Sequence, residues 1–162
     1  MDMRIGDLMD RDLTALTEDI TVEEAIETLL RHHMTGLPVI DEQGHVIGFV
    51  SEEDVIKSAL PAYISNLPSS AFLPDYGQFS QRLASIAAKP VSEIMHRNCV
   101  TFDVDDSDFA VASMMISKHI KIAPVMKEGI MVGYISRAYL IKRMMRSYGN
   151  SSHSFEEDDS TL

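Results

Sequence analysis

Apolar residues recur along this chain with two different periods, one typical of helices and one of strands. After Thr21 they fall three and four residues apart, on one helix face, at Val22, Ala25, Ile26, Leu29 and Leu30. Two short apolar runs follow at 37–40 and 46–50, separated by a glycine-containing turn, and predict an antiparallel pair of strands. A short strand around 13–16 is predicted before this set, and a helix over 51–60 after it.

The same order of elements returns later in the chain. Met9 and Met95 are 86 positions apart, as are Leu37–Ile40 and Ala123–Met126, and the next strands match at an offset of 85. The missing residue falls in a turn, where a deletion is tolerated. The second copy is predicted to have a strand around 99–102, a helix from Ser107, strands at 123–126 and 131–136, and a helix over 136–146. The chain is therefore an internal duplication.

Strand, helix, two strands and helix, repeated once, predict an α/β (α+β) fold in which helices cover the sheets. The first helix has a clear start, because Thr21 is followed three residues later by Glu24 in a capping-box pattern. Ser107 gives the second copy a weaker cap. Neither half buries enough apolar surface alone, so we expect the two halves to pack together.

The two copies are separated by a long connection that contains Pro61, Pro68 and Pro74. Its second part, 78–88, has helical composition and is expected either to cover one face of the fold or to form a dimer contact. The predicted organisation is repeat 1 at 1–60, an insertion or linker at 61–90, repeat 2 at 91–146 and an acidic disordered tail at 147–162.

Composition narrows the function. The formal charge of −11 and the lack of clustered Lys and Arg argue against a nucleic-acid partner. No apolar run approaches the ~18–20 residues that cross a bilayer, so no membrane association is expected. The single cysteine, Cys99, cannot form an internal disulfide, which fits a cytoplasmic protein.

Motifs for catalysis and metal binding are missing from the sequence. There is no nucleophile elbow, no phosphate-binding glycine loop and no His or Cys pair at metal-ligand spacing. We therefore expect neither an enzyme nor a metal site. His33 and His119 occupy equivalent positions at predicted helix C-termini, where a partly charged imidazole is favourable.

The duplicated segments resemble the tandem cystathionine-β-synthase (CBS) domain proteins. The marks of the resemblance are 7–9, 36–39 and 46–54 in the first copy and 93–95, 123–125 and 132–136 in the second. The resemblance implies two pseudo-symmetric β-α-β-β-α repeats packed sheet to sheet with helices outside. It also implies a regulatory module, commonly a homodimer, that binds an adenosine-containing nucleotide between the repeats and acts in trans on an effector protein.

Ser51 and Asp54 match the family's ligand motif, a Ser or Thr followed three residues later by Asp. A carboxylate can accept both hydroxyl protons of a ribose diol, and a helix N-terminus favours phosphate oxygens. The same two residues also fit a helix cap, with Ser51 as N-cap and Asp54 at the third helical position. Both interpretations stay open at this point.

By resemblance, other residues complete the same site. Phe49, Cys99 and Val100 would lie against the base, and Ile122 and Pro124 would belong to the wall that the second repeat contributes. Lys121 and Arg137 would reach the phosphates. Core packing is the alternative for the apolar residues, and an exposed surface position is the alternative for the two cations. In the second copy Tyr139 replaces Asp54, so its site, with Leu13, Thr14, Thr35, Gly36 and Pro38, lacks a diol anchor. We therefore expect at most one nucleoside site per chain.

The expected ligand is AMP, ADP or ATP, with S-adenosylmethionine or NADH less favoured, and no cofactor is required. The main alternative is a ligand-free structural module that dimerises and docks on a partner.

Overall fold

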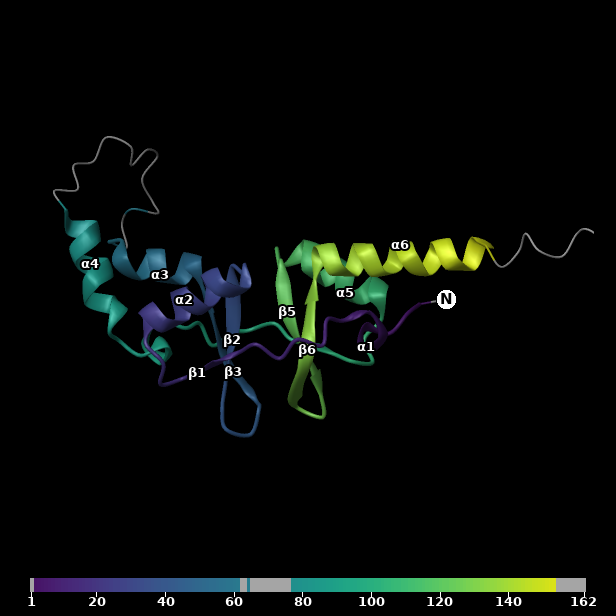
Figure 1. Ribbon diagram of the computed structural model, residues 1–162, viewed down its shortest axis with the longest axis horizontal. Helices are drawn as coiled ribbons and strands as arrows, with labels where there is room; N and C mark the ends of the chain where they lie inside the picture. The colour runs from purple at the N-terminus through teal and green to yellow at the C-terminus, as the bar shows by residue number, and fades with distance from the viewer. Residues whose placement is uncertain (1, 62–63, 65–76, 154–162) are drawn as a thin grey trace, which may run out of the picture. The chain divides into compact units, whose positions relative to one another are not determined.

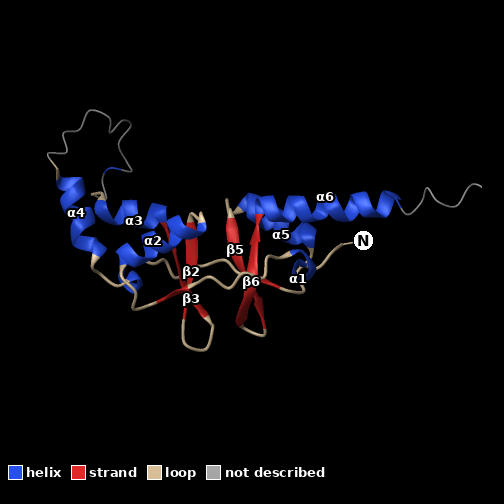
Figure 2. Cartoon of the chain, in the orientation of Figure 1, coloured by secondary structure: helices blue, strands red, loops and turns tan. Residues whose placement is uncertain are grey.

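The computed structural model describes residues 2–61, 64 and 77–153, and the side chains as far as residue 150. The chain forms two compact units (Figures 1 and 2). The first unit is Thr14–Cys99, and the second unit combines Met1–Leu13 with Val100–Leu162. Each contains one three-stranded sheet with helices packed on it.

The first unit contains β1 (Leu16–Thr17), α2 (Val22–His32), β2 (Gly36–Ile40), β3 (Val46–Ser51), α3 (Glu52–Ala59), α4 (Gln78–Ala87) and a 3-10 turn (Val91–Glu93). The strand β1 runs parallel to β2, and β2 runs antiparallel to β3. The core of this unit includes Leu16, Val22, Ala25, Leu29, Leu37, Val39, Val50, Val55, Ala59, Val91 and Met95.

The second unit repeats this arrangement with α1 (Ile5–Leu8), β4 (Phe102–Asp103), α5 (Asp108–Ser117), β5 (Ile122–Lys127), β6 (Ile130–Ser136) and α6 (Arg137–His153). Its strands pair in the same way, β4 parallel to β5 and β5 antiparallel to β6. The predicted order β-α-β-β-α is therefore confirmed in both copies. Its core includes Ile5, Leu8, Met9, Phe102, Val111, Met115, Val125, Ile135 and Leu140.

The helix starts lie at the predicted residues. The Thr21 hydroxyl accepts the Glu24 N–H at 3.1 Å, and the Glu24 carboxylate accepts the Thr21 N–H at 2.9 Å, which completes the capping box of α2. Ser107 caps α5 through one bond only, from the Ala110 N–H. At the other end, α2 stops at His33, which is in the left-handed region with φ of 53°.

The first strand of each copy starts later than the sequence predicts. Strand β1 begins at Leu16 rather than near residue 13, and β4 begins at Phe102 rather than near residue 99. The parallel register pairs Leu16 with Val39 and Phe102 with Val125. The residue before each of these partners is a proline, which has no N–H to donate to a ladder, so pairing starts after it.

The last helix is longer than predicted. Helix α6 continues beyond residue 146 to His153. The prediction that a disordered tail begins at residue 147 is therefore corrected, since residues 147–153 are helical. Gly149 is exposed and has open space around it, and a single exposed glycine costs a helix only about 1 kcal/mol. The rest of the predicted tail, 154–162, lies outside the described residues.

The insertion contains the helix expected at 78–88, observed as α4. It packs against α3 and α2 of its own unit and buries Ile86. This contact fits the expectation that the insertion covers one face of the fold.

The short segment that opens each sequence repeat packs on the sheet of the other repeat. Asp10 exchanges two backbone hydrogen bonds with Tyr134 of β6, both 2.8 Å long. His96 exchanges two with Phe49 of β3, at 2.9 and 3.1 Å. The predicted boundaries 1–60 and 91–146 are those of the sequence repeats. The compact units have different boundaries, because the opening segment of each repeat belongs to the unit formed by the other repeat.

Candidate functional site

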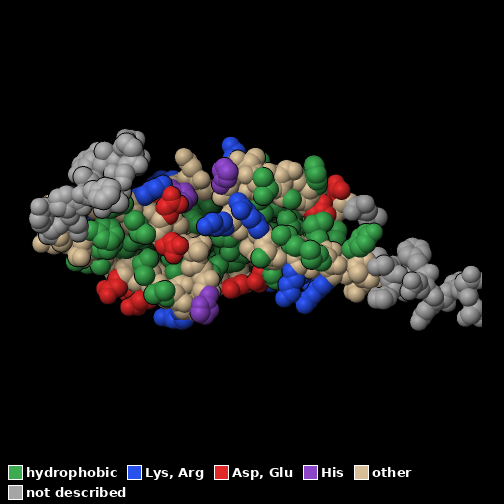
Figure 3. Space-filling view, turned by 90° about the horizontal axis from the view of Figure 1, so that it is seen from above, with side chains coloured by type: hydrophobic (Ala, Val, Ile, Leu, Met, Phe, Trp, Pro, Cys, Tyr) green, Lys and Arg blue, Asp and Glu red, His purple; other side chains and the backbone are tan. Residues whose placement is uncertain are grey.

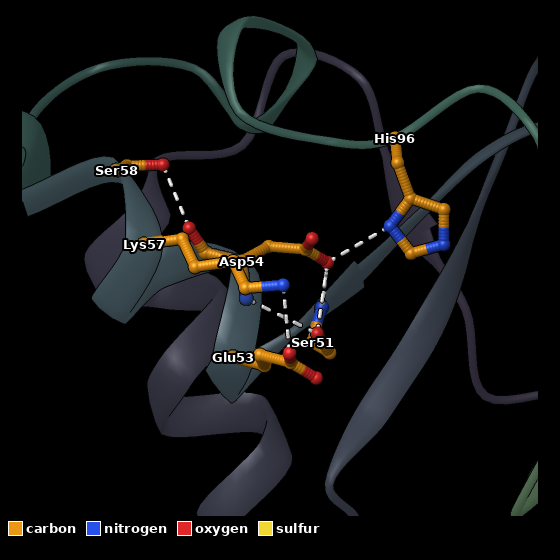
Figure 4. A network of polar contacts seen from close by, with 6 residues as sticks. All are labelled: Ser51, Glu53, Asp54, Lys57, Ser58 and His96. Atoms are coloured by element: carbon orange, nitrogen blue, oxygen red, sulfur yellow. Dashed lines mark hydrogen bonds and ion pairs between the residues drawn. The ribbon is translucent and has the colours of Figure 1, made fainter. Parts of the chain in front are cut away.

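The N-terminus of α3 is built by a capping box around Ser51 and Asp54 (Figure 4). The Ser51 hydroxyl accepts the Asp54 N–H at 3.2 Å, and the Asp54 Oδ2 accepts the Ser51 N–H at 2.8 Å. The Ser51 hydroxyl also donates to the same Oδ2 at 2.8 Å. The capping interpretation of this motif is confirmed, and it fixes the Asp54 carboxylate at the start of a helix, where the dipole favours negative charge.

A third donor reaches the same oxygen from a distant part of the sequence. The imidazole Nδ1 of His96 lies 3.0 Å from Asp54 Oδ2 (Figure 4). Among the described residues, no hydrogen bond reaches the other carboxylate oxygen, Oδ1. The side chain of Asp54 is one-fifth exposed. The carboxylate is thus held by one oxygen while the other remains available as an acceptor.

The ring of Phe49 adjoins this polar group. Phe49 and His96 have ring centroids 5.6 Å apart with an interplanar angle of 42°. A Cβ atom at Gly36 would collide with the Phe49 ring, so glycine at this position leaves the room that the ring occupies. The first unit therefore brings together three of the candidate residues, Phe49, Ser51 and Asp54, and adds His96.

His96 was missed by sequence reasoning, although the interaction follows from the segment exchange. His96 is 42 residues from Asp54, so no local spacing rule links the two. The duplication itself contains a signal that could have drawn attention to His96. His96 follows Met95 in the segment that opens repeat 2, just as Asp10 follows Met9.

The predicted residues of the second unit form their own group around the start of α6. The Arg137 guanidinium donates to the carbonyl oxygens of Ile120, at 2.7 Å, and Met115, at 3.3 Å. Its backbone N–H donates to the Lys121 carbonyl. Arg137 thus satisfies carbonyls at the C-terminal end of α5, where positive charge is favourable. The alternative expected for Arg137, a solvated surface position, is wrong, because its side chain is half-buried and bonded to two carbonyl oxygens.

The remaining predicted residues lie on or near strand β5 and at the junction of the units. Ile122 pairs with Ser136 and Pro124 with Tyr134 in the sheet, and the side chain of Lys121 is exposed. Cys99 ends the first unit and Val100 begins the return to the second. Burial raises the pKa of the Cys99 thiol to about 11, so at neutral pH it is a protonated, weakly reactive group.

The equivalent cap in the second unit carries different chemistry. The Ser136 hydroxyl accepts the Tyr139 N–H at 3.1 Å, but Tyr139 has no carboxylate to return the bond. At the place of His96 stands Asp10, whose Oδ1 accepts the Asp12 N–H. The acid and the imidazole of the first unit are therefore both replaced in the second.

Other site types find no support in the described part of the chain. No group of three or more His, Cys, Asp or Glu side chains there is placed to hold a metal ion. No helix within it is both long and apolar enough to cross a membrane.

Comparison with known proteins agrees with the duplication. A family model described as CBS domain matches residues 5–60 and 91–146. A CBS domain-containing protein of Dictyostelium discoideum is 25% identical over 147 residues, which cover 90% of this chain and 94% of the relative.

Solved structures share the fold. The CBS domain of a CBS domain containing membrane protein from Sphaerobacter thermophilus aligns with a TM-score of 0.64 at 27% identity, covering 87% of each chain. CBSX2, a CBS-pair protein from Arabidopsis thaliana, aligns with a TM-score of 0.73 at 20% identity, covering 93% of this chain and 99% of its own. A structure of CBSX2 in complex with AMP aligns with a TM-score of 0.68 at 19% identity, covering 90% of this chain and 98% of its own.

Proposed function

Because the chain belongs to the CBS domain family, whose model matches it twice, we propose that it is a regulatory module that binds an adenosine-containing nucleotide at Asp54. In this proposal the protein senses AMP, ADP or ATP, performs no catalysis and acts in trans on a partner protein. The AMP complex of CBSX2, which has the same fold, supports this ligand class.

One observation carries the proposal: the Asp54 carboxylate is fixed by three donors on Oδ2 and keeps Oδ1 as an acceptor. A ribose diol needs acceptors held at a defined place, since ordering a side chain on binding costs about 0.5–1.5 kcal/mol. Here that ordering is already made by the fold. The neighbouring Phe49 ring offers an apolar surface for a base.

The capping role of Asp54 does not oppose the binding role. A cap uses one carboxylate oxygen, and a carboxylate has two oxygens with about four lone pairs. The roles of Cys99, Val100, Lys121, Ile122, Pro124 and Arg137 toward base and phosphate remain predictions. For Arg137 the two carbonyl bonds favour the structural role.

Thermal unfolding tests the proposal with AMP, ADP, ATP, S-adenosylmethionine and NADH, each at millimolar concentration. A ligand that binds only the folded state at about 100 times its Kd adds about 2.7 kcal/mol, which is a clear rise in Tm. We expect that rise with the adenine nucleotides and expect Asp54→Ala to abolish it.

The control must separate lost binding from a lost helix cap. Glu24 has the same position in the capping box of α2 as Asp54 has in that of α3. Glu24→Ala should lower the Tm of the free protein by a comparable amount, since either loss costs about 0.5–2 kcal/mol, and still show the full nucleotide shift. If none of the ligands shifts the wild-type Tm, the ligand-free docking module becomes the better account.

A further inference from the structure

The imidazole of His96 holds Asp54 with one ring nitrogen and presents the other to solvent. Its Nδ1 lies 3.0 Å from Asp54 Oδ2, and the side chain is 47% exposed. Figure 4 shows Nε2 on the side of the ring that faces away from the carboxylate, and within the described chain no hydrogen bond reaches this atom. Backbone bonds to Phe49 and the contact between the two rings keep the imidazole in place.

The contact with Asp54 is compatible with two charge states of His96. An ionised carboxylate only accepts hydrogen bonds, so Nδ1 must carry a hydrogen to bond to it. Nδ1 carries one in one neutral tautomer and also in the imidazolium, which has a hydrogen on both nitrogens. Histidine changes its charge between about pH 5 and 8. A change of pH in this range therefore alters the charge beside Asp54 and turns Nε2 from an acceptor into a donor, while the bond to Asp54 stays.

The charges on the elements that surround His96 are mostly negative. The first turn of α3 carries Glu52 and Glu53 beside Asp54. The ammonium group of Lys57, one turn later, bonds to Glu53 at 2.8 Å, and the pKa of Lys57 is raised first by this bond and less by the charge of Asp54. Strands β2 and β3 contribute no charged side chain.

The first unit as a whole is acidic as well. Between Thr14 and Cys99 the chain has twelve Asp and Glu residues and five Lys and Arg residues. Figure 3 shows Asp and Glu side chains on the surface of this unit. Arg97, which follows His96, is exposed and forms no ion pair in the part of the chain that the structure describes. Protonated His96 is thus the cation in direct contact with the Asp54 carboxylate.

This environment affects the phosphate of a nucleotide and not its nucleoside part. Adenosine is uncharged, whereas a phosphate monoester carries a charge of about −1.5 to −2 at pH 7. The N-terminus of a helix favours phosphate oxygens, but the carboxylates in the first turn of α3 oppose a phosphate there. A positive charge on His96 offsets the negative charge of Asp54 and removes part of this opposition.

From this arrangement we infer that His96 determines specificity at the Asp54 site, because its protonated form favours phosphorylated adenosine ligands over adenosine. The inference rests on the proposed nucleotide function and adds a proton linkage to it. Since the protonated form binds the anion more tightly, AMP binding takes up protons, and the affinity for AMP rises as the pH falls from about 8 to about 6.5. A unit charge within about 8 Å of a phosphate, screened by solvent and salt, changes the affinity by about 3- to 10-fold.

The second unit provides an internal comparison. Asp10 stands at the place of His96, and Tyr139 stands at the place of Asp54. The backbone exchange with the facing strand is nevertheless the same in both units. The fold therefore accepts an aspartate at this position, so packing alone does not explain the imidazole at residue 96.

Isothermal titration calorimetry of the full chain with AMP and with adenosine tests the inference at constant ionic strength. Between about pH 8 and about pH 6.5 we expect the Kd for AMP to fall about 3- to 10-fold and the Kd for adenosine to change by less than about 2-fold. The ratio of the two Kd values removes effects of pH that are common to both ligands. AMP itself loses negative charge as the pH approaches about 6, which opposes the expected change and so does not produce it.

Two histidine variants make the test specific. His96→Asn keeps an N–H donor but does not change its charge with pH, so the ratio of the Kd values should no longer rise at high pH. The matched control is His45→Asn. His45 also bonds through Nδ1 to a carboxylate, that of Asp41, at 3.1 Å, and is similarly exposed, at 53%. Its replacement should leave the pH dependence intact.

Proton uptake provides a second measurement that needs no substitution. Titrations at about pH 7.5 in buffers that differ in ionisation enthalpy should show net uptake of protons with AMP and none with adenosine. A wild-type Kd ratio that does not depend on pH, no proton uptake with AMP, a dependence that persists in His96→Asn, or one that is lost in His45→Asn would each overturn the inference and leave nucleotide binding intact. A wild-type chain that binds neither ligand would overturn the proposed function, and the inference with it.

Discussion

At the scale of single residues, the contact between His96 and Asp54 joins two segments that are remote in sequence. The capping bonds from Ser51 hold Asp54 Oδ2 through two donors that belong to one residue. The imidazole, 3.0 Å away, adds a bond from a different direction. His96 is therefore a positioning residue for the carboxylate that we assign to the ribose.

Replacing His96 should weaken nucleotide binding without abolishing it. His96→Ala removes one of the three donors, so the carboxylate is held less firmly before binding, and completing its order costs up to about 0.5–1.5 kcal/mol. That cost corresponds to a rise of about 2- to 10-fold in the Kd for AMP, which isothermal titration calorimetry can measure.

The conservative variant makes this test specific. His96→Asn keeps an N–H donor near the position of Nδ1 and should recover part of the lost affinity. A Kd that is the same in the wild type and His96→Ala, or an Asn variant no better than Ala, would contradict the positioning role. The backbone bonds between His96 and Phe49 remain in both variants, so the strand pairing itself is not at issue.

At the scale of elements, local sequence signals located the helices better than the strands. The capping boxes at Thr21 and Ser51 depend on residues three apart, and both were predicted at the correct position. Where a strand begins is decided by its partner strand. Strands β1 and β4 begin at Leu16 and Phe102 because a proline precedes each residue with which these pair in β2 and β5. His96 contacts Asp54 because the segment that opens the second repeat packs on the sheet of the first repeat. No local sequence pattern predicts this packing.

The duplicated Val/Ile-Gly pattern in β3 and β6 has a packing reason that the structure makes visible. A Cβ atom at Gly48 would lie 2.5 Å from Met95 Sδ and 3.2 Å from the His96 carbonyl oxygen. The opening segment of repeat 2 can therefore approach β3 only because position 48 has no side chain.

Gly48→Ala should consequently destabilise the protein, while Gly149→Ala should not. At position 48 the added methyl group forces Met95 and the backbone apart, an overpacking cost of about 1–3 kcal/mol. At position 149, in the exposed part of α6, alanine has open space and gains about 0.5–1 kcal/mol of helix propensity. Urea unfolding of both variants measures the difference, and a neutral Gly48→Ala would show that Met95 adjusts without cost.

At the scale of the whole molecule, the exchange of opening segments makes each unit depend on residues from both sequence repeats. Residues 1–13 complete the second unit, and residues 91–99 complete the first. The duplication predicted the number and order of elements, because each copy encodes them locally. The duplication could not predict the exchange, because the sequence pattern is the same whether the opening segment packs on the sheet of its own repeat or on that of the other repeat.

Two equivalent methionines, Met9 and Met95, provide the sharpest test of this exchange. They are 7% and 8% exposed, and each packs beneath a glycine of the opposite repeat, Gly133 and Gly48. Met→Ala in a core costs about 2–5 kcal/mol through lost contacts and the cavity left behind.

The two substitutions should therefore have crossed effects. In amide hydrogen exchange, Met9→Ala should speed exchange in β5 and β6, although Met9 belongs to the first sequence repeat. Met95→Ala should speed exchange in β2 and β3 instead. Each variant serves as the control for the other, because residue type, burial and expected cost are matched. If Met9→Ala loosened β2 and β3 while β5 and β6 stayed protected, each repeat would have to fold on its own opening segment, and the exchange described above would be wrong.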